Sequence, residues 1–301
     1  MEWLDPKLDV VFKLLFTRYE MLLRNMLEAV LNREIADLEV LNPQIHGERS
    51  GDKAIQLDVR VRLIDGTRVD VEMQLRAEDA LVERLVYYAA REYSGQLERG
   101  GQYNDLTPTV LIVWMVAPLF PDLEQYHSIF ELRERRTNKL FSEQLALHVL
   151  QLGFIHRDDG AGVTARDDAL RRWGRFLLAK TEAELDALAL EDPIMSAARS
   201  ALDQLSQDPE AARLARERSD AIKLNDIALA RAHKRGEIEG KIEGKIEAIL
   251  AVLAARGLSV AEEARVRIAT EKDPVVLDRW LTRAVIVTDV AELFLSEPTR
   301  P

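Results

Sequence analysis

The sequence contains no cysteine, which excludes disulfide bonds and zinc sites built on thiolates. Its five histidines show no spacing typical of metal ligands. No apolar run approaches the ~18 residues of a transmembrane helix, and the longest, TVLIVWMVA at 109–117, has only the length of a strand. The opening MEWLDPKLDV lacks the basic and apolar segments of a secretory signal peptide. We therefore expect a soluble cytoplasmic protein with no membrane partner.

Basic residues are also fewer than acidic ones. The chain has 41 Lys and Arg and 52 Asp and Glu, which gives a formal net charge of −11. Such a balance is not typical of a protein that coats DNA non-specifically. It does not exclude a nuclease, since the acidic residues of a metal site count against a local basic path. The 301 residues, 47% of them hydrophobic, suffice for one large domain or two smaller ones.

Hydrophobic periodicity predicts an α/β part over residues 1–160. Two helices are expected within 1–33, the first with Asp5 as N-cap and Pro6 at its first position. Strands follow over 38–117. The helical pattern at 79–100 leads into the apolar strand at 109–117, and a helix between two strands favours a parallel, right-handed crossover.

Further strands are predicted at 126–135 and 145–154, on either side of the polar stretch RTNKLFSEQ. The remaining 161–301 are predicted to form an all-helical C-terminal region. Its main feature is one long helix from about Pro209 to Ala255, with two shorter helices after Gly257 and after Pro274.

The segment IQLDVRVRLIDGTRVDVEMQLR, at 55–76, alternates apolar and polar residues as a two-stranded hairpin does. A two-residue loop would place polar side chains opposite apolar ones, which the two-residue period forbids. A three-residue loop at 64–66, with Gly66 in the left-handed conformation, removes this conflict. The resulting register places Asp58 opposite Glu72, with their Cβ atoms about 5 Å apart. It also places Gln56 opposite Gln74 and Arg60 opposite Asp70.

Two carboxylates at that separation repel by roughly 3 kcal/mol at an effective dielectric constant near 20. One interpretation is a site for Mg²⁺, which prefers one or two carboxylates together with water and a substrate phosphate. The alternative is that Arg60, on the same face, neutralises both acids in a solvated cluster. The hairpin by itself leaves both interpretations open.

The order of these segments resembles the core of the PD-(D/E)XK nuclease superfamily and, more closely, the recombination-promoting nuclease (Rpn) family of transposase-related proteins. The resemblance covers about the first 155 residues. It rests on DPKLDVVFKLLF, LLRNMLEAVLN, LNPQ, LDVRV, VEMQ, ERLVYYAAREYSGQL and GGQYNDLTPTVLIVWM, in that order. It implies a mixed sheet flanked by helices.

The same resemblance implies the residues of a site. Asp58 and Glu72 would hold Mg²⁺, or Mn²⁺ or Ca²⁺ in its place. Gln74 stands where the wider superfamily often has a lysine, and a glutamine orients water only through neutral hydrogen bonds. Asp9 is a candidate further ligand, with a first-turn acid stabilised by the helix dipole as the alternative.

Four side chains are candidates for contacts with the DNA backbone. Arg84, Tyr88 and Arg91 recur at helical spacing on the helix after the hairpin, and Lys13 lies on the first helix. The alternative is a partly exposed helix face with Tyr87 or Tyr88 in the core.

The C-terminal region contains a four-residue repeat, GEIEGKIEGKIE at 236–247. On a helix its glycines 236, 240 and 244 form a stripe, and each costs about 1 kcal/mol against alanine. Such a stripe suggests close helix packing and a homo-oligomer, namely a dimer, or else a remnant of repeat expansion. Neither interpretation assigns it a catalytic role.

The leading hypothesis is therefore a Mg²⁺-dependent DNA endonuclease linked to recombination, mobile elements or defence. A second is a non-catalytic DNA-binding or self-assembling scaffold with a degenerate nuclease fold. A third, a toxin-like protein restrained by a partner, is not addressed by any motif.

Overall fold

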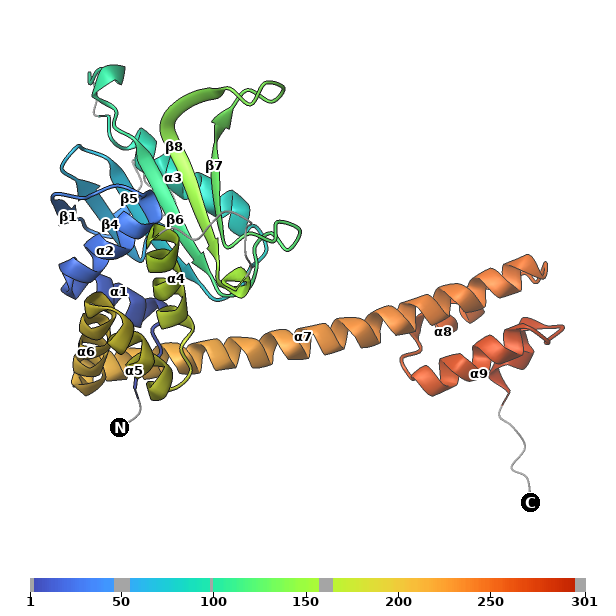
Figure 1. The fold of residues 1–301 in the computed structure, drawn as a ribbon. Helices are drawn as coiled ribbons and strands as arrows, with labels where there is room; N and C mark the ends of the chain where they lie inside the picture. The colour runs from blue at the N-terminus through green and yellow to red at the C-terminus, as the bar shows by residue number, and fades with distance from the viewer. Residues whose placement is uncertain (1–2, 46–54, 98–99, 157–164, 296–301) are drawn as a thin grey trace. The chain divides into compact units, whose positions relative to one another are not determined.

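The computed structural model describes residues 3–45, 55–97, 100–156 and 165–295. Its strands are β1 Leu38–Val40, β2 Gln44–Ile45, β3 Ile55–Gln56, β4 Val59–Leu63, β5 Arg68–Gln74, β6 Thr109–Met115, β7 His127–Arg133 and β8 Leu140–Gln151. Its α-helices are α1 Asp9–Arg18, α2 Glu20–Leu31, α3 Leu81–Ser94, α4 Ala165–Leu178, α5 Glu182–Glu191, α6 Pro193–Gln207, α7 Pro209–Ala255, α8 Glu262–Thr270 and α9 Pro274–Ala284. The described ranges also contain the 3₁₀ helices η1 Tyr103–Asp105, η2 Leu152–Phe154 and η3 Val290–Phe294. The predicted α/β class is confirmed (Figure 1).

The main sheet has six strands in the order β1-β4-β5-β6-β8-β7. Strand β6 is parallel to both β5 and β8, and the other neighbouring pairs are antiparallel. Because α3 connects β5 to β6, the predicted parallel crossover is confirmed. Gln74, Met115 and Gln151 lie in register at the carboxyl ends of the three parallel strands, so these ends share one edge of the sheet.

The register of the hairpin β4–β5 is the predicted one, with Arg60 opposite Asp70. Gly66 has φ of +88°, and its N–H donates to the Leu63 carbonyl at 2.9 Å. A Cβ at Gly66 would lie 2.7 Å from Thr107 Cγ2, so the close approach of this loop also requires glycine.

One predicted pair of that hairpin is wrong. Gln56 does not continue the ladder toward Gln74, but lies opposite Gln44 in a separate two-stranded sheet of β2 and β3. The chain leaves the ladder at Leu57 and Asp58, between β3 and β4. The N–H of Leu57 donates instead to the carbonyl of Pro43 at 3.0 Å.

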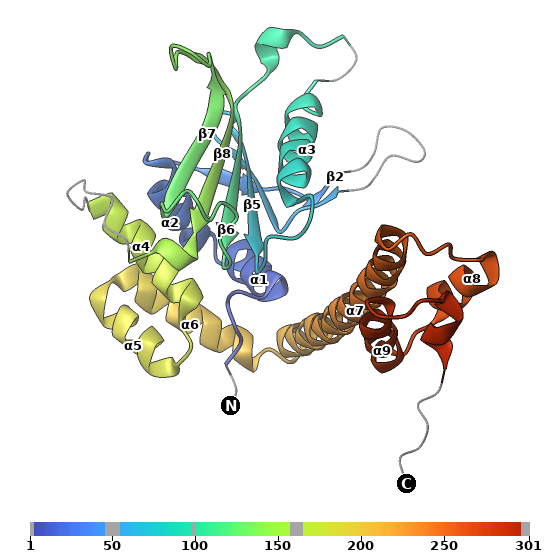
Figure 2. The same cartoon turned by 90° about the vertical axis from the view of Figure 1, so that its right-hand side faces the viewer.

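The two faces of the sheet carry different helices. Apolar side chains of β4 and β5, among them Val59, Val61 and Val71, belong to a core shared with α1, α2, α4 and α6. Helix α3 covers the other face, where Leu85 packs with Leu111 and neighbouring side chains of β6 and β8. Figure 2 shows α3 and α2 on opposite sides of the strands. The polar side of the hairpin therefore faces the layer of α3.

Helices α4 to α6 complete the larger core. Trp173 of α4 donates its indole N–H to the Asn25 side chain at 3.0 Å, and its ring lies 5.4 Å from that of Phe16. The chain divides into compact units at Met1–Ser219 and Asp220–Pro301. This division lies later in the chain than the expected boundary at 160/161. The reason is that helices α4 and α6, which follow residue 160, bury their apolar faces against α1 and α2.

The second unit has a core of its own. The end of α7 packs with α8, α9 and η3 through side chains such as Ile249, Leu253, Ile268, Leu277 and Trp280. The predicted limits of the long helix α7 are confirmed, as are the two shorter helices after it. The glycine stripe of the repeat faces open space in the described part of the chain. A Cβ added at Gly236, Gly240 or Gly244 would have no neighbouring atom within 4 Å. Close packing along this stripe with a second chain stays a prediction.

Two element boundaries differ from prediction. Helix α1 begins at Asp9 rather than Pro6, because Asp5 closes a turn instead, accepting the N–H of Lys7 at 3.0 Å. Strand β8 begins at Leu140, within the stretch predicted as a polar connection, because β7 supplies its backbone partners there. In the described ranges, no helix is both long enough and apolar enough to cross a membrane.

Candidate active site

Asp58 and Glu72 lie side by side near the carboxyl end of β5. Asp58 immediately precedes β4, and its Oδ2 accepts the N–H of Met73 at 2.8 Å. Its own N–H donates to Glu72 Oε1 at 3.3 Å. Each acid thus accepts a backbone N–H from the other's side of the hairpin, so the two side chains are neighbours, although Asp58 lies just outside the ladder that begins at Val59.

The acid pair is not on a solvated surface. Glu72 is 4% exposed and Asp58 is half-buried. Burial raises the pKa of Asp58 to about 7, and the charge of Asp9 adds to that increase. Burial and the neighbouring Asp58 charge raise the pKa of Glu72 to about 8. Both groups would therefore gain from a cation beside them.

Arg60 is not that cation. Its guanidinium donates to both oxygens of Glu92 on α3, at 2.8 and 2.9 Å, and the Glu92 side chain is 1% exposed. The alternative in which Arg60 neutralises Asp58 and Glu72 is therefore wrong. In the described part of the chain neither acid forms an ion pair with Lys or Arg, although Lys13 and Arg218 lie near enough to lower the pKa of Asp58.

Gln74 joins the acid pair to α3. Its Nε2 donates to Glu72 Oε2 at 3.0 Å, while its Oε1 accepts from Arg84 at 3.0 Å. Arg84 also donates to Glu78 at 3.1 Å. The amide is therefore held in one orientation, with its nitrogen toward the carboxylates.

Helix α1 brings Asp9 and Lys13 toward the same place, one turn apart on one helix face. The Asp9 carboxylate accepts the N–H of Val10 at 2.9 Å and is ion-paired with Arg218 of α7 at 2.7 Å. Among the described residues no group of three or more His, Asp or Glu side chains is placed to hold a metal ion. Asp9 thus lies within electrostatic reach of Asp58 but is engaged elsewhere.

The remaining predicted residues lie on α3. Tyr88 is half-buried and packs on the core under this helix, whereas Tyr87 is 41% exposed. Burial raises the pKa of Tyr88, and the charges of Glu72 and Asp58 contribute. Arg91 is half-buried, one turn further along. Arg84 and Tyr88 therefore adjoin the acids, and Arg91 is more distant along the helix.

Sequence reasoning missed a second buried group of charges beneath α3. Glu92, which binds Arg60, lies 4.0 Å from Arg68. Asp70 is fully buried, and its pKa is raised well above the usual value by burial and by the charge of Glu92. Glu92 continues the buried stripe of α3 after Leu85 and Ala89. An acid at such a position predicts a buried cationic partner, so the sequence contained a usable signal for this group. Arg218 carried no such signal, being 209 residues from Asp9.

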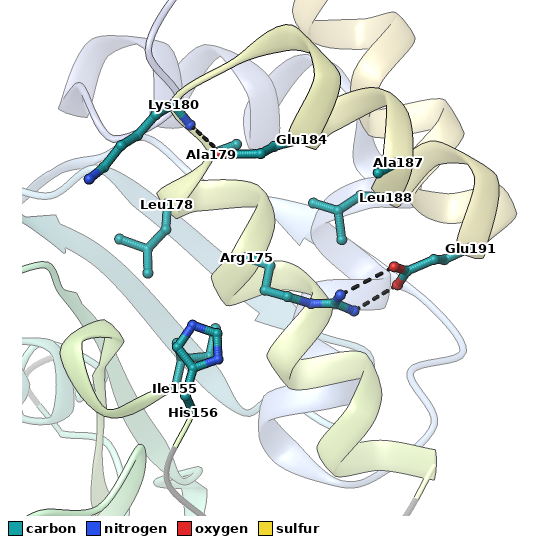
Figure 3. A pocket seen from close by; sticks show the side chains of 10 residues that line it. All are labelled: Ile155, His156, Arg175, Leu178, Ala179, Lys180, Glu184, Ala187, Leu188 and Glu191. Carbon is teal, nitrogen blue, oxygen red and sulfur yellow. Dashed lines mark hydrogen bonds and ion pairs between the residues drawn. The ribbon is translucent and has the colours of Figure 1, made fainter.

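A cavity elsewhere in the first unit contains none of these residues. It encloses about 400 Å³ between η2, α4 and α5. Its lining is mainly apolar, from Ile155, Leu178 and Leu188, and Arg175 forms a bidentate ion pair with Glu191 at its side (Figure 3). The two acids in its wall have separate partners: Glu191 binds Arg175, and Glu184 accepts the N–H of Lys180 at 2.7 Å. The cavity lining therefore contains no acid pair comparable to Asp58 and Glu72.

The chain matches a family model described as PD-(D/E)XK nuclease family transposase, over residues 6–231. The match includes the acid pair, both helices beside it and Arg218. No curated protein and no solved structure matches the chain.

Proposed function

Because the chain belongs to the PD-(D/E)XK nuclease transposase family, we propose that it is a divalent-metal-dependent DNA endonuclease that cleaves phosphodiester bonds in recombination, mobile-element movement or defence. The observation that carries this proposal is the buried pair Asp58 and Glu72, which has no cation of its own among the described side chains. A structural role is poorly served by such a pair, because burying like charges together destabilises the fold.

The donor set fits an ion of the Mg²⁺ class. That ion takes oxygen ligands and commonly binds through one or two carboxylates, completing its shell with water and substrate phosphate. Asp58 and Glu72 would hold it, and the present geometry gives Asp9 no direct part because its carboxylate binds Arg218. When bound, the ion supplies Lewis-acid activation of water and neutralises negative charge on the phosphate.

Gln74 would orient the attacking water. One amide N–H binds Glu72, and the second forms no hydrogen bond within the described ranges, so it can meet a water molecule beside the acids. Because a glutamine carries no charge, it positions the water without lowering its pKa as a lysine would. Arg84 keeps the amide fixed through Oε1 and is therefore a positioning residue for Gln74.

Cationic side chains on two helices would bind the DNA backbone around this centre. Lys13 on α1 lowers the pKa of Asp58 by its charge, so its ammonium lies near the acid pair. Arg84 approaches from α3. A phosphate between these two groups would meet positive charge in a protein whose overall charge is −11. Tyr88 and Arg91 extend the same surface along α3.

The test is nicking of supercoiled plasmid by the purified full-length protein with Mg²⁺, Mn²⁺, Ca²⁺ or EDTA. Asp58→Asn and Glu72→Gln preserve the shape of each acid and should abolish cleavage. Glu83→Gln makes the same chemical change on the exposed side of α3 and serves as the matched control, which should cut as the wild type does.

Thermal unfolding with and without metal gives the second readout. A divalent ion should raise the Tm of the wild type and of Glu83→Gln, but not of the two site variants. Absence of both cleavage and metal stabilisation in the wild type would favour the scaffold hypothesis. Equal cleavage by wild type and site variants would show that another centre or a contaminant acts.

A further inference from the structure

The hairpin β7–β8 extends beyond the rest of the sheet. Strand β8 pairs with β6 only from Leu145 onward. Before that point Leu140 and Ser142 pair with β7, and a bulge between Ser142 and Ala146 interrupts the ladder. Figure 1 shows this end of the hairpin extending past the adjacent strand β6. The tip was predicted as a polar connection, and the structure makes it a two-stranded ribbon.

The turn at the tip is held by Glu134. Its carboxylate accepts the N–H of Arg136 at 3.1 Å and both the N–H and the hydroxyl of Thr137, at 2.6 and 2.5 Å. These hydrogen bonds, led by the one from the Thr137 hydroxyl, lower the pKa of Glu134. Asn138 supplies the left-handed residue that closes the loop, with φ of +57°. The acid of the turn is thus used by the turn itself.

As a result, the cations of the tip are available for a ligand. Arg135, Arg136 and Lys139 are exposed, and none forms an ion pair within the described part of the chain. Arg133 is the exception, since it binds Glu131 at 2.7 Å. Three exposed cations within five residues stand out against the net charge of the chain, which is −11.

Apolar side chains accompany these cations. Phe141 is 83% exposed, and Leu132 on the facing strand is 48% exposed. Water-exposed aromatic surface beside arginines is typical of surfaces that meet nucleic acid, where cations bind phosphates and an apolar side chain contacts or wedges between bases. A two-stranded β-ribbon also has dimensions that fit the DNA major groove.

We propose that the β7–β8 tip is an auxiliary binding site for duplex DNA, in which Arg135, Arg136 and Lys139 bind backbone phosphates and Phe141 contacts bases. This inference rests on the proposed function, because it assumes that DNA is the substrate. It assigns the tip a role in affinity and in the length of duplex engaged, and none in the chemical step.

The position of the tip sets a length scale. Glu72 is in register with Val113 and, through it, with Val149 of β8. Val149 lies nine positions after Leu140, which corresponds to at most about 30 Å of strand, because the bulge after Ser142 shortens the path. At about 3.4 Å per base pair, a duplex that reaches from the acids to the tip spans at most about nine base pairs. Shorter duplexes engage one site at a time.

The test measures DNA binding without cleavage, by fluorescence anisotropy of labelled duplexes with Asp58→Asn protein in EDTA. In that background the tip variant carries Arg135→Gln, Arg136→Gln and Lys139→Gln. The control variant carries Arg231→Gln, Lys234→Gln and Arg235→Gln, which remove the same charge from an exposed part of α7. Circular dichroism checks that both remain folded.

For a 20-base-pair duplex, the tip variant should bind at least about tenfold more weakly at 0.1 M salt. Its plot of log affinity against log salt should be shallower by about 2.7, or 0.9 for each lost phosphate contact. Phe141→Ala should weaken binding by about fivefold or more without changing this slope, because stacking or wedging involves no counterion release. The difference between tip variant and parent should disappear for a six-base-pair duplex.

Equal losses in the tip and control variants would overturn the inference, because they would report net charge alone. Unchanged affinity in the tip variant would overturn it as well and would point to an acidic protein as the occupant. The nuclease proposal is judged separately, from plasmid cleavage by protein with Asp58 intact. A tip that binds DNA in a chain that does not cut would leave this inference standing and remove the other.

Discussion

Replacing Glu72 with glutamine should remove activity and at the same time make the metal-free protein more stable above neutral pH. Burial and the Asp58 charge raise the pKa of Glu72 from its usual 4.5 to about 8. A raised pKa means that ionisation disfavours the folded state. The wild type therefore loses stability as pH rises from the pKa of the unfolded chain toward that of the folded one, and glutamine has no such loss.

The size of the gain follows from the pKa shift. A shift from 4.5 to about 8 corresponds to about 5 kcal/mol of disfavoured ionisation, an upper value because part of it is shared with Asp58. The hydrogen bonds that the carboxylate accepts from Asp58 and Gln74 lower this pKa and are therefore already included in the shift. A gain of about 2 to 5 kcal/mol is expected above pH 8. Near pH 4 the two proteins should unfold alike.

The assay is urea unfolding in EDTA at pH 5, 7 and 9, followed by tryptophan fluorescence. A Trp280→Phe background restricts the signal to the first unit, which contains Trp3, Trp114 and Trp173. Glu83→Gln on the exposed side of α3 is the control and should show no gain that depends on pH. Saturating Mg²⁺ should reverse the order, since it stabilises only the protein that binds it.

A Glu72→Gln protein less stable than the wild type at pH 9 in EDTA would refute this reasoning. It would mean that the carboxylate is a net stabiliser, held by hydrogen bonds that outweigh its burial. A gain of the same size at pH 5 and pH 9 would refute it differently, by locating the effect in packing rather than in charge.

Three further perturbations follow from other contacts. Arg60→Met leaves the buried Glu92 without its main partner and should lower the free energy of unfolding by about 3 kcal/mol, whereas adding Glu92→Leu should recover part of that loss in urea unfolding. Gly66→Ala should cost about 1 to 3 kcal/mol by the same assay, since its φ is +88° and Cβ would meet Thr107. Gly240→Ala should raise the stability of helix α7 by about 1 kcal/mol, measured as thermal unfolding by circular dichroism. A loss of stability together with a lower mass in light scattering would instead indicate that a partner chain packs on the glycine stripe.

The hairpin register could be predicted because its constraint is local. Alternation of side chains and the conformation of Gly66 allow only one arrangement of β4 and β5, and this arrangement makes Asp58 and Glu72 neighbours. The limits of α7 were equally predictable, since Pro209 starts the helix and Gly257 follows its end. The strand at Leu140–Gln144 was not, because polar residues form a strand there only through backbone pairing with β7.

The sequence by itself determined which acids meet across the hairpin and on which side of the sheet they lie. Only the tertiary structure decided that this side is buried, because α3 folds back over it from the carboxyl end of β5. It also decided the partners of the cations: Arg60 binds Glu92 and Arg218 binds Asp9, so the acid pair is left without either guanidinium. These choices depend on distances between residues far apart in the chain. The period of a strand sets the direction of a side chain, whereas packing sets its dielectric surroundings and therefore its charge.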